Sequence, residues 1–170
     1  MYKAGKQAYE VIKYYEKCRL QLYMCPAGKW TIGWGHVVVL NGRALEGESD
    51  RTKAYRVYPN GITQQKADEL LDMDVRQKVV LASEALTVAK VRQLEQHEFD
   101  AIVSLCYNCG TAPIKPGKSI PLAIAKGDPK LIEKAFGLWN KSGGKVLDGL
   151  TKRRRIEAHL FNTGEVNFSV

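Results

Sequence analysis

Glu16, Cys25 and Thr31 are the residues whose types and spacing best suit acid–base chemistry. A carboxyl group held against apolar walls keeps its proton near neutral pH and can protonate a leaving oxygen, as glycoside hydrolysis requires. A second group must then activate water or attack carbon from the other side of the sugar. A cysteine does this as its thiolate. On the residues alone Glu16 is a candidate acid, with Cys25 and Thr31 on a hairpin that would face it. The alternatives of a solvated glutamate at a helix end, a cysteine that acts as a small apolar residue and a threonine that only forms strand stay open.

Two elements must position these side chains. An apolar face with helical spacing predicts a helix that ends near residues 15–17 and carries Glu16 at the edge of its buried stripe. Residues 20–40, rich in β-branched and aromatic residues around the turn at Pro26-Ala27-Gly28, predict a small twisted antiparallel sheet. Glu16 is thus expected in a groove where helix gives way to sheet. The helical face consists of Ala8, Val11, Ile12 and Tyr15.

The rest of the chain predicts a helical body. Residues 41–61 are rich in Gly, Asn, Ser and Asp and predict a long loop with room for one short strand. Thr63 is the expected N-cap of a long helix, and Asp128-Pro129 starts another. Further helices are expected around residues 99–106 and 150–161. A small β-lobe inserted into a helical body is an α+β arrangement.

The motif around the three residues resembles a known family. It is similar to the active-site signature of the phage-type lysozymes, or endolysins, of glycoside hydrolase family 24. The pattern in this chain is Glu16, eight residues, Cys25, five residues and Thr31, which runs into Ile32–His36. The closest resemblance is to the lambdoid, P22-like branch. The segments Phe99–Thr111 and Trp139–Arg155 resemble two further blocks of that family.

The resemblance implies a fold and an activity. The fold would be one lysozyme-like α+β domain over residues 1–170, with a β-lobe at about 18–62, a larger helical lobe and an active-site cleft between them. The activity would be that of a muramidase. It would hydrolyse the β-1,4 bond between N-acetylmuramic acid and N-acetylglucosamine in bacterial peptidoglycan, with no metal or organic cofactor.

The resemblance also implies individual roles. Glu16 would be the general acid, Thr31 would position water or a substrate hydroxyl, and Cys25 stands where many members carry Asp. The protonation state of Cys25, and an inverting or retaining course, stay open. The implied supporting residues are His36, paired with Asp74 on the long helix, and Arg153, set against the catalytic Glu. The implied sugar-binding residues are Tyr107, Asn108, Ser119 and Asn140.

The charge and composition limit the kinds of partner and the location that can be expected. The net charge of +8 and the pI near 9.3 favour an anionic partner such as nucleic acid, an anionic membrane or the cell wall. No apolar stretch is long enough to span a membrane, and the start has no apolar leader region. Together with these features, the family resemblance implies a monomer held in the host cytoplasm until a separate holin-type membrane protein releases it to the periplasmic wall.

Four other interpretations are open. A zinc or redox module at Cys106-x-x-Cys109 lacks a second ligand pair, and free thiols are the default for a cytosolic chain. A cysteine peptidase or amidase would use Cys25 and His36. A nucleic-acid binder would use the basic C-terminal helix predicted at about residues 150–161. A wall-binding domain would have lost catalysis through Cys25, and it would bind peptidoglycan without cutting it.

Overall fold

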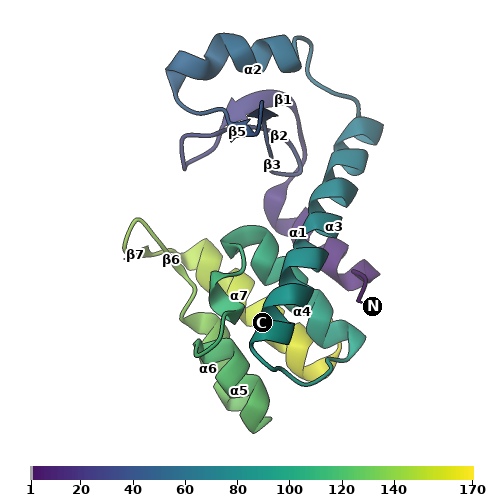
Figure 1. Ribbon diagram of the computed structural model, residues 1–170, viewed down its shortest axis with the longest axis vertical. Coiled ribbons are helices and arrows are strands. Elements are labelled where there is room, and N and C mark those ends of the chain that lie inside the picture. Colours follow the sequence, from purple (N-terminus) through teal and green to yellow (C-terminus); the bar gives the residue numbers. More distant parts are fainter. Residues whose placement is uncertain (1) are drawn as a thin grey trace. The chain divides into compact units, whose positions relative to one another are not determined.

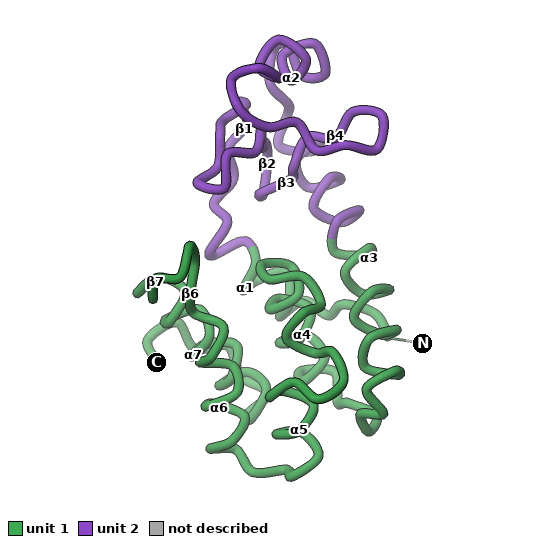
Figure 2. The backbone as a smooth tube through the Cα atoms, turned by 60° about the vertical axis from the view of Figure 1, so that its left-hand side comes forward, with its two compact units in different colours: residues 1–12, 75–170 green, residues 13–74 purple. Residues whose placement is uncertain are grey.

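The computed structural model describes residues 2–170, which divide into two compact units (Figures 1 and 2). The sheet unit is Lys13–Asp74. The helical unit comprises the residues up to Ile12 together with Val75–Val170. Helices α1 (Lys6–Glu16) and α3 (Gln64–Val88) each run from one unit into the other. That the whole chain is a single domain stays a prediction.

The sheet unit contains the predicted antiparallel sheet. Its strand order is β1-β2-β3, and the register sets Tyr23 opposite Thr31 and Ile32 opposite His36. The turn after the first strand closes where Gly28 N–H donates to Cys25 O at 2.8 Å. Gly28 has a φ of 76°, which glycine adopts without the steric cost of a Cβ. The strands are β1 (Arg19–Met24), β2 (Trp30–Gly33) and β3 (His36–Val37).

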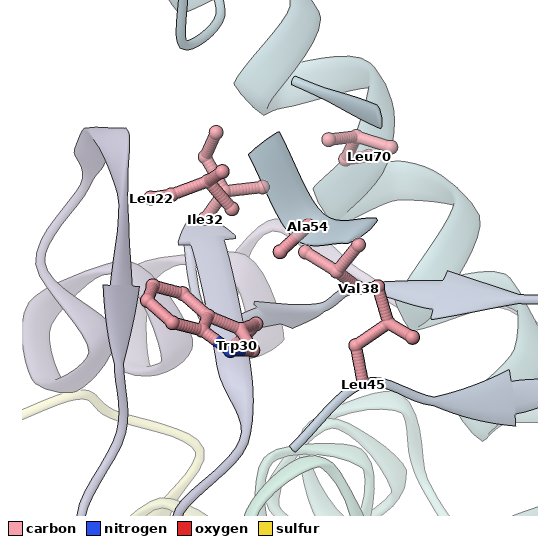
Figure 3. Packing of buried hydrophobic residues seen from close by; sticks show 7 residues of the cluster. All are labelled: Leu22, Trp30, Ile32, Val38, Leu45, Ala54 and Leu70. Atoms are coloured by element: carbon pink, nitrogen blue, oxygen red, sulfur yellow. The ribbon is translucent and has the colours of Figure 1, made fainter. Parts of the chain in front are cut away.

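An apolar cluster holds the sheet unit together (Figure 3). Strands β1 and β2 supply one side of this cluster, and helices α2 and α3 supply another. The Trp30 indole N–H donates to Gly47 O at 2.8 Å, so the ring is buried without leaving its donor unpaired. The cluster consists of Leu22, Trp30, Ile32, Val38, Leu45, Ala54 and Leu70.

Residues 41–60 hold more structure than the sequence predicts. The expected short strand is present as a hairpin of β4 (Val39–Leu40) and β5 (Arg43–Ala44). The expectation of loop for the remainder is wrong, because η1 (Glu48–Asp50) leads into the helix α2 (Arg51–Val57). This helix buries Ala54 alone, so its sequence carries no apolar periodicity that would predict it.

Buried Asp50 organises this segment. Its carboxylate accepts from Lys53 Nζ at 2.8 Å and pairs with Arg43 Nη1 at 2.8 Å. It also accepts from the backbone N–H of Glu46 at 3.2 Å. These three partners join the hairpin to the start of α2, and they hold the pKa of Asp50 far below its ordinary value.

The long helix α3 confirms a sequence prediction. Thr63 Oγ1 accepts from Lys66 N–H at 3.1 Å, which is the N-cap hydrogen bond expected from the sequence. Ala67, Leu70, Leu71 and Val75 recur at helical spacing in the sequence, and all four are buried.

The helical unit is built around α4 (Gln96–Cys109), which is buried continuously from Glu98 to Cys106. A helix buried on all sides needs neighbours around it, and Figure 2 shows it among the helices of its unit. Asp128 caps α6 by accepting from Lys130 N–H at 2.9 Å, as predicted. The other helices are η2 (Ala112–Ile114), α5 (Ser119–Lys126), α6 (Pro129–Gly137) and α7 (Asp148–Thr163).

A second small hairpin was not predicted. The segment Ser142-Gly143-Gly144 reads from sequence only as a helix break, whereas the structure pairs β6 (Lys141–Ser142) with β7 (Lys145–Val146). Gly143 and Gly144 have φ values of 57° and 78°, which suit a tight hairpin turn. Within residues 2–170 no helix is long and apolar enough to cross a membrane. The α+β class is confirmed.

Candidate active site

Glu16 is the last residue of α1, as the sequence predicts. Lys17 follows with a φ of 51°, a left-handed conformation that ends the helix and turns the chain into β1. The Glu16 side chain is half-buried and lies against Gly35, between β2 and β3. A Cβ at Gly35 would stand 2.9 Å from Glu16 Oε2. The glycine therefore leaves the space that the carboxylate occupies.

Cys25 and Thr31 lie together on the hairpin of β1 and β2. Thr31 is only 2 % exposed, and its hydroxyl donates to Lys29 O at 3.0 Å. The same hydroxyl also hydrogen-bonds the Cys25 sulfur. A hydroxyl has one proton to donate. Lys29 O accepts that proton in this structure, and the Cys25 sulfur is the other group within reach of the hydroxyl.

The surroundings of Cys25 favour its thiolate. Burial raises the pKa of the thiol, but hydrogen bonds from the Lys29 backbone N–H, the Thr31 hydroxyl and the Ala27 backbone N–H outweigh that effect. The pKa of Cys25 is therefore lowered overall. Cys18, in the same unit, shows the opposite result, because burial raises its pKa. Of these two cysteines, Cys25 is the one whose surroundings lower its pKa.

Tyr23 belongs to this cluster and was missed from sequence. It stands opposite Thr31 in the register, so both side chains are on one face of the sheet. Burial raises the pKa of Tyr23, and the charges of Glu16 and Cys25 raise it further. Tyr23 therefore lies within electrostatic range of both residues. Its position two residues before Cys25 was the signal that sequence reasoning passed over.

His36 and Asp74 form the pair that the resemblance implies. His36 Nδ1 lies 2.9 Å from Asp74 Oδ2, and the two side chains are 13 % and 20 % exposed. The contact joins β3 to α3 within the sheet unit. The pairing is confirmed, while its structural rather than catalytic role stays a prediction.

Arg153 lies on α7 of the helical unit and is buried. Its Nε donates to Glu157 Oε1 at 3.1 Å, and its Nη2 donates to Ser104 O at 3.3 Å. The Ser104 hydroxyl also donates to Glu157 Oε1, at 2.7 Å. The predicted pairing of Arg153 with Glu16 stays a prediction.

Arg154 corrects one interpretation of the basic run. The sequence alone leaves a solvated cationic face open for Arg154 and Arg155, but Arg154 is only 1 % exposed. Its Nε pairs with Glu157 Oε2 at 2.8 Å, and Nη1 donates to Cys109 Sγ at 2.9 Å. Arg155 is exposed. Helical phase explains the difference, because Arg154 and Glu157 are three residues apart on one inward face of α7.

The four predicted sugar-binding residues all lie in the helical unit, apart in sequence from the sheet unit's Glu16. Asn140 Nδ2 donates to Thr151 Oγ1 at 3.0 Å, and Ser119 Oγ donates to Ala135 O at 3.4 Å. Asn108 is exposed and accepts from Arg154 Nη2, while Tyr107 is half-buried. Their binding of sugar stays a prediction.

The four cysteines are free thiols. Within the part of the chain that the structure describes, no group of three or more His, Cys, Asp or Glu side chains could hold a metal ion. Burial raises the pKa of Cys106 to about 12, so this cysteine of the C-x-x-C pair stays protonated.

Comparison with known proteins places the chain in a family. The phage lysozyme family model matches residues 13–157. An endolysin of Acyrthosiphon pisum secondary endosymbiont phage 1 is 32 % identical over 90 % of this chain and 93 % of its own length. The chain therefore belongs to the phage lysozyme family.

Two other similarities agree with this membership. An endolysin of Lactococcus phage c2 is 33 % identical over 94 % of this chain. The chain spans only 60 % of that relative's length. Among solved structures, an endolysin from Escherichia coli O157:H7 phage FAHEc1 superposes with a TM-score of 0.75 at 26 % identity, over 98 % of this chain and 97 % of its own. The lysozyme-like fold is thereby confirmed.

Proposed function

We propose that this protein is a muramidase that hydrolyses the β-1,4 bond between N-acetylmuramic acid and N-acetylglucosamine in peptidoglycan. The observation that carries the proposal is the grouping of Glu16 with the hydrogen-bonded pair of Cys25 and Thr31 in one unit. Tyr23 stands opposite Thr31 in the sheet, and its pKa is raised by burial and then by the charges of Glu16 and Cys25. A carboxyl group and a second ionisable group are the minimum that glycoside hydrolysis needs.

In this mechanism Glu16 donates its proton to the glycosidic oxygen as the bond from that oxygen to the sugar carbon breaks. Positive charge develops on the sugar. If the course is inverting, the Cys25 thiolate takes a proton from a water held by Thr31, and that water attacks the carbon. If it is retaining, the Cys25 sulfur attacks the carbon, and water later releases the sugar. The anomer of the first product, read by proton NMR, distinguishes the two.

The names of the relatives support a biological role. Both relatives are endolysins, and we propose the same role here, namely release of phage progeny by lysis of the host wall. The net charge of +8 would concentrate the protein on an anionic wall. A separate holin-type membrane protein would let it pass from the host cytoplasm to the periplasmic peptidoglycan.

Product analysis tests the reaction class. Purified peptidoglycan is digested with the protein, reduced with borohydride, and its fragments are identified by mass spectrometry. A muramidase leaves reduced N-acetylmuramic acid at the new ends. Released stem peptides would instead establish an amidase or peptidase that uses Cys25. Protein that sediments with the wall but releases no fragments would be a binding domain without catalysis.

A further inference from the structure

Asp68, on the first turns of α3, binds two side chains that flank the candidate acid. Its Oδ1 pairs with Lys13 Nζ at 2.9 Å and accepts from Trp34 Nε1 at 2.8 Å. The Lys13 ammonium also lies 5.0 Å from the centre of the Trp34 ring, within cation–π range. Lys13, Trp34 and Asp68 thus form one closed set of contacts, which we call the Asp68 cluster.

Each partner of Asp68 adjoins Glu16 or the wall it packs on. Lys13 is one helical turn before Glu16 on α1, so the two side chains emerge from the same face of the helix. Trp34 immediately precedes Gly35, and Glu16 Oε2 lies where a Cβ on Gly35 would come too close to it. One carboxylate therefore fixes both the turn of helix that carries the acid and the loop against which the acid rests.

The Asp68 carboxylate is held firmly in its charged form. Hydrogen bonds from Lys13, from the Trp34 indole and from Gln64 outweigh partial burial and lower the pKa of Asp68. The cluster is therefore intact throughout the neutral range. Lys13 and Asp68 are 40 % and 45 % exposed, and an exposed ion pair alone contributes little to geometry. Here, however, one carboxylate oxygen has two donors on two different elements, and one of them is the Trp34 indole.

We propose that Asp68 is a positioning residue for Glu16: through Lys13 and Trp34 it fixes the distance between the end of α1 and the Gly33–His36 turn. The inference rests on the proposed function, in which Glu16 is the acid. A displacement of about 1 Å from the productive geometry is enough to cost roughly a hundredfold in rate. Loss of the cluster is thus expected to lower kcat without removing any group that contacts the sugar.

The test compares Asp68→Ala and Asp68→Asn with Glu69→Gln on soluble peptidoglycan fragments. Glu69 is the next residue of α3, is exposed, and pairs with Lys66 at 3.3 Å, so Glu69→Gln makes the same charge change beside the cluster. We expect Asp68→Ala to lower kcat ten- to a hundredfold, with KM within about twofold of wild type. Asp68→Asn keeps an acceptor for the Trp34 indole N–H, so its kcat should fall less. Glu69→Gln should match wild type.

A second set of variants separates positioning from loss of stability. Lys13→Met and Trp34→Phe each remove one contact of the Asp68 cluster. Because the three residues act as one unit, combining either change with Asp68→Ala should lower kcat little further than Asp68→Ala alone. All assays are done at a temperature where circular dichroism shows each variant folded. An unchanged kcat for folded Asp68→Ala, with only its melting temperature lowered, would mean a structural role and would overturn the inference.

An NMR measurement distinguishes this failure from failure of the proposed function. The amide signal of Gly35 reports the neighbouring Glu16 carboxylate whether or not the protein cuts peptidoglycan. We expect the signal to shift both in Glu16→Gln and in Asp68→Ala, and to stay in place in Glu69→Gln. If wild type cuts nothing yet the signal shifts, the function fails and the positioning stands. If the signal stays in place in Asp68→Ala, the positioning fails whatever the activity.

Discussion

Gly35 and Glu16 are complementary: the carboxylate of one occupies the space that a side chain on the other would fill, with Glu16 Oε2 only 2.9 Å from a Cβ built at Gly35. Gly35 also has a φ of 86°, a left-handed conformation that L-residues avoid. The glycine is therefore required twice, once for the backbone turn and once for the acid beside it.

Substitution of Gly35 separates these two requirements. Gly35→Ala should cost roughly 1–2 kcal/mol of unfolding free energy from the left-handed conformation and should also displace Glu16, lowering kcat at least tenfold. Gly42→Ala is the matched control, because Gly42 has a φ of 76° and nothing within 4 Å of its Cβ position. Gly42→Ala should lose a similar amount of unfolding free energy but keep the kcat of wild type. Urea unfolding and kcat are measured for both. Equal loss of activity in the two would contradict the contact.

Thiol labelling tests the state of Cys25. Because hydrogen bonds lower its pKa, the alkylation rate of Cys25 by iodoacetamide should rise with pH around a midpoint below that of a cysteine in a short unstructured peptide measured alongside. Cys18 and Cys106, whose pKa values burial raises, should label only at higher pH. Mass spectrometry of the peptides assigns each rate. In Thr31→Val the Cys25 midpoint should move upward. A midpoint that does not move would mean that Thr31 does not stabilise the thiolate.

The buried ion pairs of α7 make a prediction about stability. Glu157 is fully buried between Arg153 and Arg154. Glu157→Gln would leave two buried guanidinium groups without their carboxylate, and loss of one partner of a buried pair typically costs about 3–5 kcal/mol. Glu133→Gln on α6, an exposed site, should change the unfolding free energy by less than about 0.5 kcal/mol. A loss below about 1 kcal/mol for Glu157→Gln would show that the network contributes little.

Salt dependence tests the role of the net charge. If the charge of +8 concentrates the protein on an anionic wall, the lytic rate on cell walls should fall as ionic strength rises, because salt screens exposed charges beyond about 10 Å at 0.1 M. The rate on short soluble glycan fragments of the same wall provides the control and should change less, because each fragment carries few of the wall's charges. Equal salt dependence for the two substrates would mean that salt acts on something other than attraction to the wall, for example on the folding of the protein.

Sequence reasoning succeeded where a local pattern has one structural outcome. The apolar spacing that leads to Glu16 predicted the end of α1, and Thr63 and Asp128 predicted the caps of α3 and α6. The pairing of His36 with Asp74 came from the family motif, since residues 38 positions apart give no local signal.

Sequence reasoning failed where tertiary contacts decide the outcome. Helix α2 buries only Ala54 and depends on the ion pairs of Asp50, which no periodicity reveals. Arg154 is buried because its helical phase matches Glu157, although a run of three arginines resembles a solvated face. The Asp68 cluster joins α1, α3 and the turn before β3, so only the folded chain brings its members together.

The most direct test of the central claim is the rate at which wild type and Glu16→Gln release reducing ends from purified peptidoglycan. Glu10→Gln is measured beside them, because Glu10 is an exposed glutamate of the same helix and its loss makes the same charge change. We predict that Glu16→Gln falls at least a hundredfold, as expected for loss of a general acid, while Glu10→Gln keeps wild-type activity. Release of reducing ends at the wild-type rate by folded Glu16→Gln would contradict the assignment of Glu16 as the acid.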